Sequence, residues 1–90
     1  MALYTMILDY AGGTYLSQLD AADEREALWA WVSRLRSERI AHGASDDVAN
    51  AFQDETDSDL AALDGVSGVW CATATGREGL ALVNIVATAS

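Results

Sequence analysis

The stretch that decides the fold is YTMILDYAGGTYLSQ, residues 4–18. Apolar side chains recur at every second position of its first half: Tyr4, Met6, Leu8 and Tyr10. This period of two is typical of a strand, in which successive side chains point to opposite faces of a sheet. Gly12 and Gly13 follow and are able to adopt the positive φ angles of a tight turn. The stretch therefore predicts a β-hairpin over about residues 3–20.

A two-residue turn at Gly12 and Gly13 sets the expected register of this hairpin. It places Tyr10 opposite Tyr15 and Met6 opposite Leu19. One face of the hairpin then collects the apolar side chains Tyr4, Met6, Leu8, Tyr10, Tyr15, Leu19 and Ala21. We expect this face to be buried under another element.

We expect a helix over about residues 23–39 to cover the apolar face of this hairpin. Asp23 is a suitable N-cap, and Glu26 stands three positions later as in a capping box. One side of the helix gathers Ala27, Leu28, Trp31, Val32 and Leu35 at the 3.6-residue period. Trp29 lies on the flank instead, where it either meets another element of the monomer or marks an interface. The pair His42-Gly43 is expected to end the helix through a left-handed glycine.

One or two short acidic helices are expected over about residues 46–63. Ser45, followed by two aspartates, is a suitable helix start, and Val48, Ala51 and Phe52 form a short apolar stripe. A further helical turn is expected from Asp57 to Leu63, before Asp64-Gly65.

A second hairpin is expected over about residues 67–88, where valine, alanine, threonine, isoleucine and leucine dominate and Gly76 to Gly79 forms the reversal. With Thr75 opposite Leu80, one face collects Trp70, Ala72, Ala74, Ala81, Val83, Ile85 and Ala87. The other face holds Val69, Cys71, Thr73, Leu80, Leu82, Asn84 and Val86 and is also largely apolar. A sheet face open to water is normally polar, so we expect this one to be covered. Helices on both sides could cover it, but the chain has few to spare, so we expect a homodimer in which sheet faces or edges meet. The predicted interface of this homodimer comprises Trp29, Val69, Leu80, Leu82 and Val86.

These elements predict a single α+β domain over residues 1–90. The two hairpins form a four-stranded antiparallel sheet of undetermined strand order, and the main helix lies across one face. Ninety residues are near the lower limit for a hydrophobic core without disulfides or metals, which also favours self-association.

The charge of the chain limits its partners. Fourteen acidic residues stand against five arginines, for a net charge of −9. Nucleic acid is excluded as a partner because its phosphates require clustered basic side chains. The charge permits a basic protein as partner, while the simplest explanation of the acidity is solubility.

Half of the acids lie in a segment that contains no basic residue: Asp46, Asp47, Asp54, Glu55, Asp57, Asp59 and Asp64. Carboxylates suit calcium or magnesium, but a calcium loop also requires a glycine at its sharp turn and a distal glutamate, which Asp57-Ser58-Asp59-Leu60 does not provide. We therefore predict no metal site and no cofactor, with weak binding of a divalent cation as an alternative. The segment is expected to be a solvated acidic surface, with docking of a basic partner as the alternative.

No catalytic residue is predicted. His42 and Cys71 could form a nucleophilic pair only if the fold joins them, and neither lies in a nucleophile signature. The contrasting hypothesis is a small hydrolase that uses acids such as Asp9 or Asp57. A pocket with converging carboxylates would favour it, whereas a flat acidic face would favour an interaction module.

Several features of the sequence favour the cytoplasm. The single cysteine, Cys71, cannot form an internal disulfide. The first ten residues lack the basic start and cleavage site of a signal peptide, and residues 80–89 are too short for a membrane span.

The run YTMILDYAGGTYLSQ, together with residues 26–29, EALW, resembles small uncharacterised bacterial proteins that have a GGTY-[IL]-SQ hairpin before a helix. The resemblance covers about the first third of the chain. In its general layout the opening is also similar to HicB-like antitoxins, although this chain adds a second hairpin and lacks a DNA-binding tail. The resemblance implies no functional residues. It makes an antitoxin or immunity-type interaction module one form of the expected function.

Overall fold

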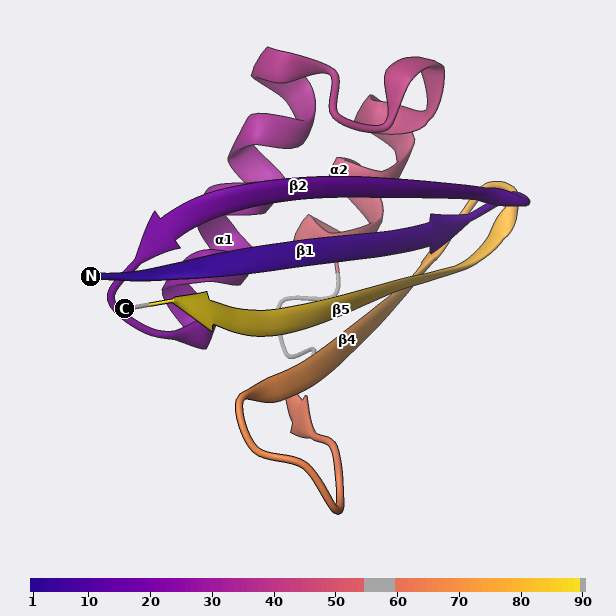
Figure 1. The fold of residues 1–90 in the computed structure, drawn as a ribbon. Helices are drawn as coiled ribbons and strands as arrows, with labels where there is room; N and C mark the ends of the chain where they lie inside the picture. The colour runs from indigo at the N-terminus through magenta and orange to yellow at the C-terminus, as the bar shows by residue number, and fades with distance from the viewer. Residues whose placement is uncertain (55–59, 90) are drawn as a thin grey trace.

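An antiparallel β-sheet carries both α-helices of this α+β protein on one of its faces (Figure 1). The computed structural model describes residues 1–54 and 60–89. The strands are β1 (Ala2–Tyr10), β2 (Gly13–Ala21), β3 (Ala61–Ala62), β4 (Val69–Gly76) and β5 (Gly79–Ala89). The helices are α1 (Glu24–Glu38), the 3₁₀ turn η1 (His42–Ala44) and α2 (Ser45–Asp54).

The strand order is β2-β1-β5-β4-β3, so in the described part of the chain the sheet has five strands rather than the predicted four. The two long hairpins meet through β1 and β5, which brings the two ends of the chain close together (Figure 1). The additional strand is β3, which pairs Ala61 with Cys71 and Ala62 with Trp70.

The expected helical turn from Asp57 to Leu63 is wrong where it can be compared. Residues 57–59 lie outside the described residues, and Ala61 and Ala62 are in strand β3. Next to them, the Leu63 N–H donates to the carbonyl of Val69 at 3.1 Å. The edge of β4 supplies backbone partners to this segment, and these replace the hydrogen bonds of a helix.

The register of the first hairpin differs from the prediction by two residues. The turn is Ala11-Gly12, with φ angles of 50° and 81°, as a type I′ turn requires, and Tyr10 pairs with Gly13. Leu8 therefore faces Tyr15. Because side chains alternate with a period of two, the shift leaves every residue on its predicted face.

Packing explains why Gly13 belongs to the strand and not to the turn. A Cβ atom at Gly13 would lie 2.6 Å from the hydroxyl oxygen of Tyr15. The Tyr15 ring thus occupies the space above Gly13. Glycine at position 13 therefore allows the Tyr15 ring to approach the backbone, and glycine at position 12 allows the positive φ angle of the turn.

The predicted register of the second hairpin is confirmed. Thr75 pairs with Leu80, and Gly76 pairs with Gly79 around Arg77 and Glu78. Gly79 has a φ of 117°, which favours glycine at this position.

Helix α1 begins as predicted, with the carboxylate of Asp23 accepting from the Glu26 N–H at 2.8 Å. The Glu26 carboxylate in turn accepts from the Ala22 N–H at 3.0 Å. The predicted ending is wrong, because Arg39 and not Gly43 takes the left-handed cap, with a φ of 53°. The chain then enters η1, and Gly43 lies inside this turn.

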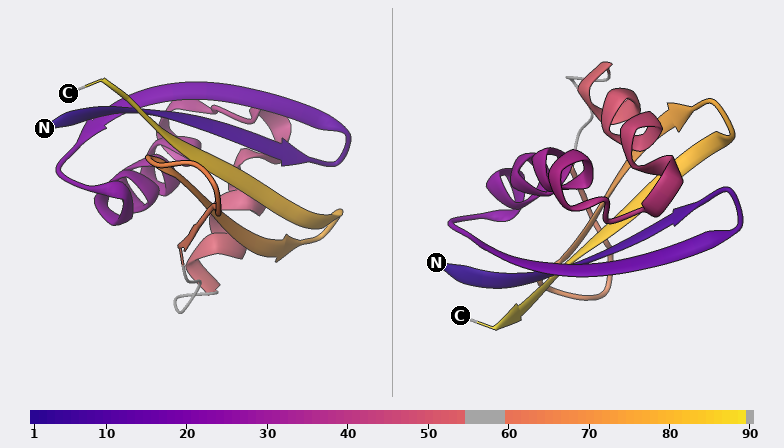
Figure 2. Two further views of the ribbon diagram at one scale, coloured as in Figure 1. Left: turned by 60° about the horizontal axis from the view of Figure 1, so that its bottom comes forward. Right: turned by 90° about the horizontal axis from the view of Figure 1, so that it is seen from above.

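The core lies between the sheet and the two helices (Figure 2). All five residues predicted for the inner side of α1 are buried, namely Ala27, Leu28, Trp31, Val32 and Leu35. Trp31 meets Phe52 of α2 edge to face, with ring centroids 5.5 Å apart. The Arg36 side chain joins the helices by donating to Asn50 Oδ1 and Gln53 Oε1 of α2.

Within residues 1–54 and 60–89, no helix has both the length and the apolar character needed to cross a membrane.

Candidate functional site

The face of the sheet opposite the helices, here called the outer face, carries a group of apolar side chains. These are Leu3, Ile7, Leu16, Val69, Leu80, Leu82 and Val86. Their positions follow from strand alternation, because each has buried helix-facing neighbours in its own strand or in the paired strand. Leu16 and Leu80 are 66% and 62% exposed. Figure 1 looks onto this face, with the helices behind the sheet.

Four of the five predicted interface residues lie on the outer face. Val69 pairs with Val86, and their two strands also place Leu80 and Leu82 on this side. Trp29 does not join them, because it lies on α1, on the helix side of the sheet, and packs half-buried against the core. Sequence reasoning missed Leu16, although its place between Tyr15 and Ser17 in an alternating strand already assigns it to the outer face.

Polar side chains of the outer face largely satisfy one another. Gln18 Nε2 donates to Thr5 Oγ1 at 3.0 Å, and Thr5 Oγ1 lies 2.5 Å from Thr88 Oγ1. Near the first turn, Thr14 Oγ1 donates to Asp9 Oδ1 at 2.7 Å. Thr5, Gln18 and Thr88 are therefore partly satisfied within the chain, which lowers the desolvation cost of covering this part of the face.

The described acids of the acidic segment differ in their surroundings. Asp46 makes an exposed ion pair with Arg39, with 3.1 Å between Oδ1 and Nη1. Asp54 lies exposed at the end of α2, whereas Asp47 is half-buried. Asp64 is also exposed. Glu55, Asp57 and Asp59 lie outside the described residues.

Asp47 instead connects α2 to the turn of the second hairpin. Its carboxylate accepts a 2.5 Å hydrogen bond from the hydroxyl of Tyr10, and the backbone N–H of Arg77 lies 3.2 Å from both of its oxygens. The Tyr10 hydroxyl accepts from the backbone N–H of Glu78 at 2.7 Å. We call these residues, Tyr10, Asp47, Arg77 and Glu78, the hairpin corner.

The environment of Tyr10 keeps its hydroxyl protonated. Burial raises the pKa of this phenol above its ordinary value of 10.0, and the hydrogen bond to Asp47 raises it further. The Glu78 N–H lowers the pKa of Tyr10 but only in part offsets these effects. Tyr10 thus serves as a hydrogen-bond donor that holds the corner together rather than as an anionic nucleophile.

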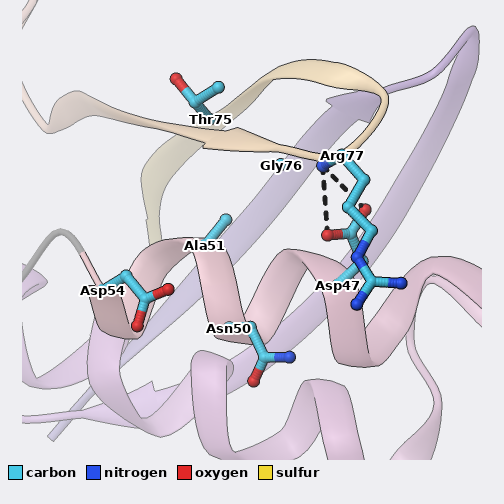
Figure 3. A pocket seen from close by; sticks show the side chains of 7 residues that line it. All are labelled: Asp47, Asn50, Ala51, Asp54, Thr75, Gly76 and Arg77. Atoms are coloured by element: carbon cyan, nitrogen blue, oxygen red, sulfur yellow. Dashed lines mark hydrogen bonds between the residues drawn. The ribbon is translucent and has the colours of Figure 1, made fainter.

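An open pocket of about 300 Å³ lies beside the hairpin corner (Figure 3). Its lining residues are Asp47, Asn50, Ala51, Asp54, Thr75, Gly76 and Arg77. The Arg77 side chain extends from the turn toward α2, past the Asp47 carboxylate that its own backbone N–H contacts (Figure 3). This surface combines both signs of charge, and Asp47 is already engaged by three hydrogen bonds, so its main chemistry is structural.

The fold separates the two residues considered as a nucleophilic pair. Cys71 is half-buried on the outer face, where it pairs with Asn84. His42 lies in η1 beside the ring of Tyr15, with 5.8 Å between the ring centroids, on the helix side of the sheet. Within the part of the chain that the structure describes, no three or more His, Cys, Asp or Glu residues are grouped so that they could hold a metal ion.

No protein-family model matches this chain, and the searches of curated proteins and of solved structures found no match.

Proposed function

We propose that this protein is a non-enzymatic interaction module that associates with itself, and that the outer face of its sheet packs against the same face of a second copy. The observation that carries the proposal is the uncovered apolar face, on which Leu16 and Leu80 are largely exposed while the neighbouring polar groups are paired. An apolar surface of this kind is stabilised by removal from water.

The distribution of charge supports a second copy as the occupant. In a chain of net charge −9, the four long strands contain only two charged residues, Asp9 and Asp20. Asp9 pairs with Thr14 and Asp20 with Leu3, so they lie at opposite ends of the first hairpin. The middle of the outer face is therefore a place where two acidic chains can approach without direct repulsion.

The enzyme alternative has less support. Asp9 accepts a hydrogen bond from Thr14 on the outer face, and Asp57 lies outside the described residues. A basic protein remains a second proposed partner, which the net charge favours, with an antitoxin or immunity-type role as one form of it. Salt distinguishes the two kinds of contact, because a charge-driven complex weakens at high ionic strength and an apolar one does not.

Sedimentation velocity at micromolar concentration tests the proposed homodimer, with Leu80→Asp as the decisive variant. Leu80 is 62% exposed, so the substitution leaves the core intact but places a charge within the proposed contact. We expect the dissociation constant to rise about 100-fold or more, because like charges meet without solvent.

Ser33→Asp is the matched control, since it adds the same charge at an exposed position of α1. It should remain a dimer. A wild-type chain that sediments only as a monomer, at low and high salt alike, would refute the proposal.

A further inference from the structure

Within residues 1–54 and 60–89, strand β2 forms one edge of the sheet, and β1 is the only strand that pairs with it. In Figure 2, right, this edge points toward the viewer, and no other element crosses in front of it. The strand is nine residues long and pairs with β1 in nine consecutive steps without a bulge. It is therefore a long and regular row of backbone donors and acceptors.

The devices that usually protect an edge strand are missing from the first seven residues of β2, and its one charged residue, Asp20, stands near the end of the strand. Proteins shield such edges with short strands, proline, bulges or charged side chains. Residues 13–19, GTYLSQL, contain neither proline nor a charged residue. The opposite edge differs, because β3 covers part of β4 by pairing Ala61 with Cys71 and Ala62 with Trp70. This contrast indicates that the β2 edge is suited to pairing with another strand.

The positions of the unpaired backbone groups follow from the structure. In an antiparallel pair, alternate residues of an edge strand direct both their N–H and C=O groups away from the neighbour. Arg34 of α1 reaches the carbonyl oxygen of Gln18 at 3.5 Å, which marks Gln18 as one of these residues. The same alternation gives the complete set: Thr14, Leu16, Gln18 and Asp20.

We propose that β2 pairs antiparallel with β2 of a second copy, around a two-fold axis at Leu16. This register places Leu16 opposite Leu16 of the second copy and Thr14 opposite Gln18. Asp20 then falls opposite Gly12, beyond the start of the strand, so no charged pair arises.

A register centred on Ser17 is less favourable, because it sets Leu16 against the polar Gln18. The chosen register buries the most exposed apolar side chain of the strand against its equivalent.

The edge contact differs from the contact through the outer face, because backbone groups of β2 make it, whereas side chains make the outer-face contact. Leu16 is the side chain that belongs to both. Two β2 strands joined in this way extend the sheet across both copies. A chain that uses both contacts assembles beyond a dimer, since each contact recruits a different copy.

Disulfide cross-linking at single positions tests the edge contact and its register. In a Cys71→Ala background, Leu16→Cys places two thiols at directly opposed residues, with Cα atoms about 5.5 Å apart, within the range for a disulfide. Thr14→Cys is the matched control: in the same register two copies of residue 14 are offset by four residues, or about 13 Å. We expect mild oxidation to cross-link the Leu16→Cys chain nearly completely and the Thr14→Cys chain at least tenfold less.

Two further variants separate this inference from the proposed outer-face contact. Adding Leu80→Asp should leave the Leu16→Cys cross-link intact even where the face contact is lost. Adding Gln18→Pro should abolish it, because proline removes an N–H that the edge contact needs but the monomer leaves unpaired. Equal cross-linking at residues 14 and 16, or a cross-link that disappears with Leu80→Asp, would overturn the inference.

Discussion

The two faces of the sheet come from the same strands but differ in what covers them. Helix α1 and helix α2 bury the inner face, where Met6, Leu8 and Ile85 have no solvent exposure. On the outer face, Leu16 and Leu80 are mostly exposed. Polar side chains of the same face form hydrogen bonds with one another. The comparison shows that apolar alternation identifies the faces that need cover, whereas the placement of α1 and α2 on one side decides which face the chain covers itself.

Removing a large side chain from each face sharpens this comparison most. Trp31→Ala should lower the free energy of unfolding by about 3–5 kcal/mol, because it empties the space between α1, α2 and the sheet. Leu16→Ala should change it by less than about 0.5 kcal/mol in dilute, monomeric protein. Urea denaturation of both variants measures the difference. Similar losses would mean that the outer face is also part of the folding core.

The hairpin corner is the next largest contribution of the inner side. Tyr10→Phe leaves the Asp47 carboxylate and the Glu78 N–H without the phenol, which should cost about 1–3 kcal/mol of unfolding free energy. Tyr4→Phe is a suitable control, because it removes the hydroxyl of another buried tyrosine of the same strand outside the corner. Chemical denaturation should show a clearly smaller loss for this control. An equal loss would argue against a special role of the corner.

The two tyrosines also predict a dependence of stability on pH. Burial raises the pKa of both Tyr4 and Tyr10 in the folded chain above 10.0, so above pH 10 the unfolded state loses these protons first. Stability contributed by the neutral phenols is therefore complete below pH 10 and is lost as the pH rises through the folded-state pKa values. Thermal unfolding between pH 8 and about 11 should show this decline, and the Tyr10→Phe chain should show a shallower one.

The smallest effect is expected at the exposed acids of the helix side. Asp46→Asn breaks an ion pair with Arg39 whose side chains are 63% and 49% exposed, so solvent already screens most of it. The unfolding free energy should change by less than about 0.5 kcal/mol. A loss above 1 kcal/mol in urea denaturation would show that the exposed acids support the fold as Asp47 does.

The predicted resemblance to small bacterial proteins with a GGTY hairpin, the HicB-like layout and the cytoplasmic location stay predictions. The comparisons with known proteins found no match that bears on them.

Local chemistry was enough to predict much of the fold. The period of two in residues 4–10, the cap at Asp23 and the apolar side of α1 all correspond to the structure. Even the misplaced first turn kept each residue on its face, because its error was an even number of residues.

The hairpin corner could not be predicted in this way. Tyr10 and Asp47 are 37 positions apart, and only the placement of α2 beneath the end of β1 brings the phenol and the carboxylate together. Likewise, strand β3 forms because the edge of β4 offers backbone partners to Ala61 and Ala62. Two alanines do not indicate in the sequence that they will find such partners. Alternation and capping depend on neighbours in the chain, so the sequence by itself determined which side chains share a face. Only the tertiary structure decided which acid would be structural, and which face and which edge the chain would leave uncovered, because these depend on contacts between distant segments.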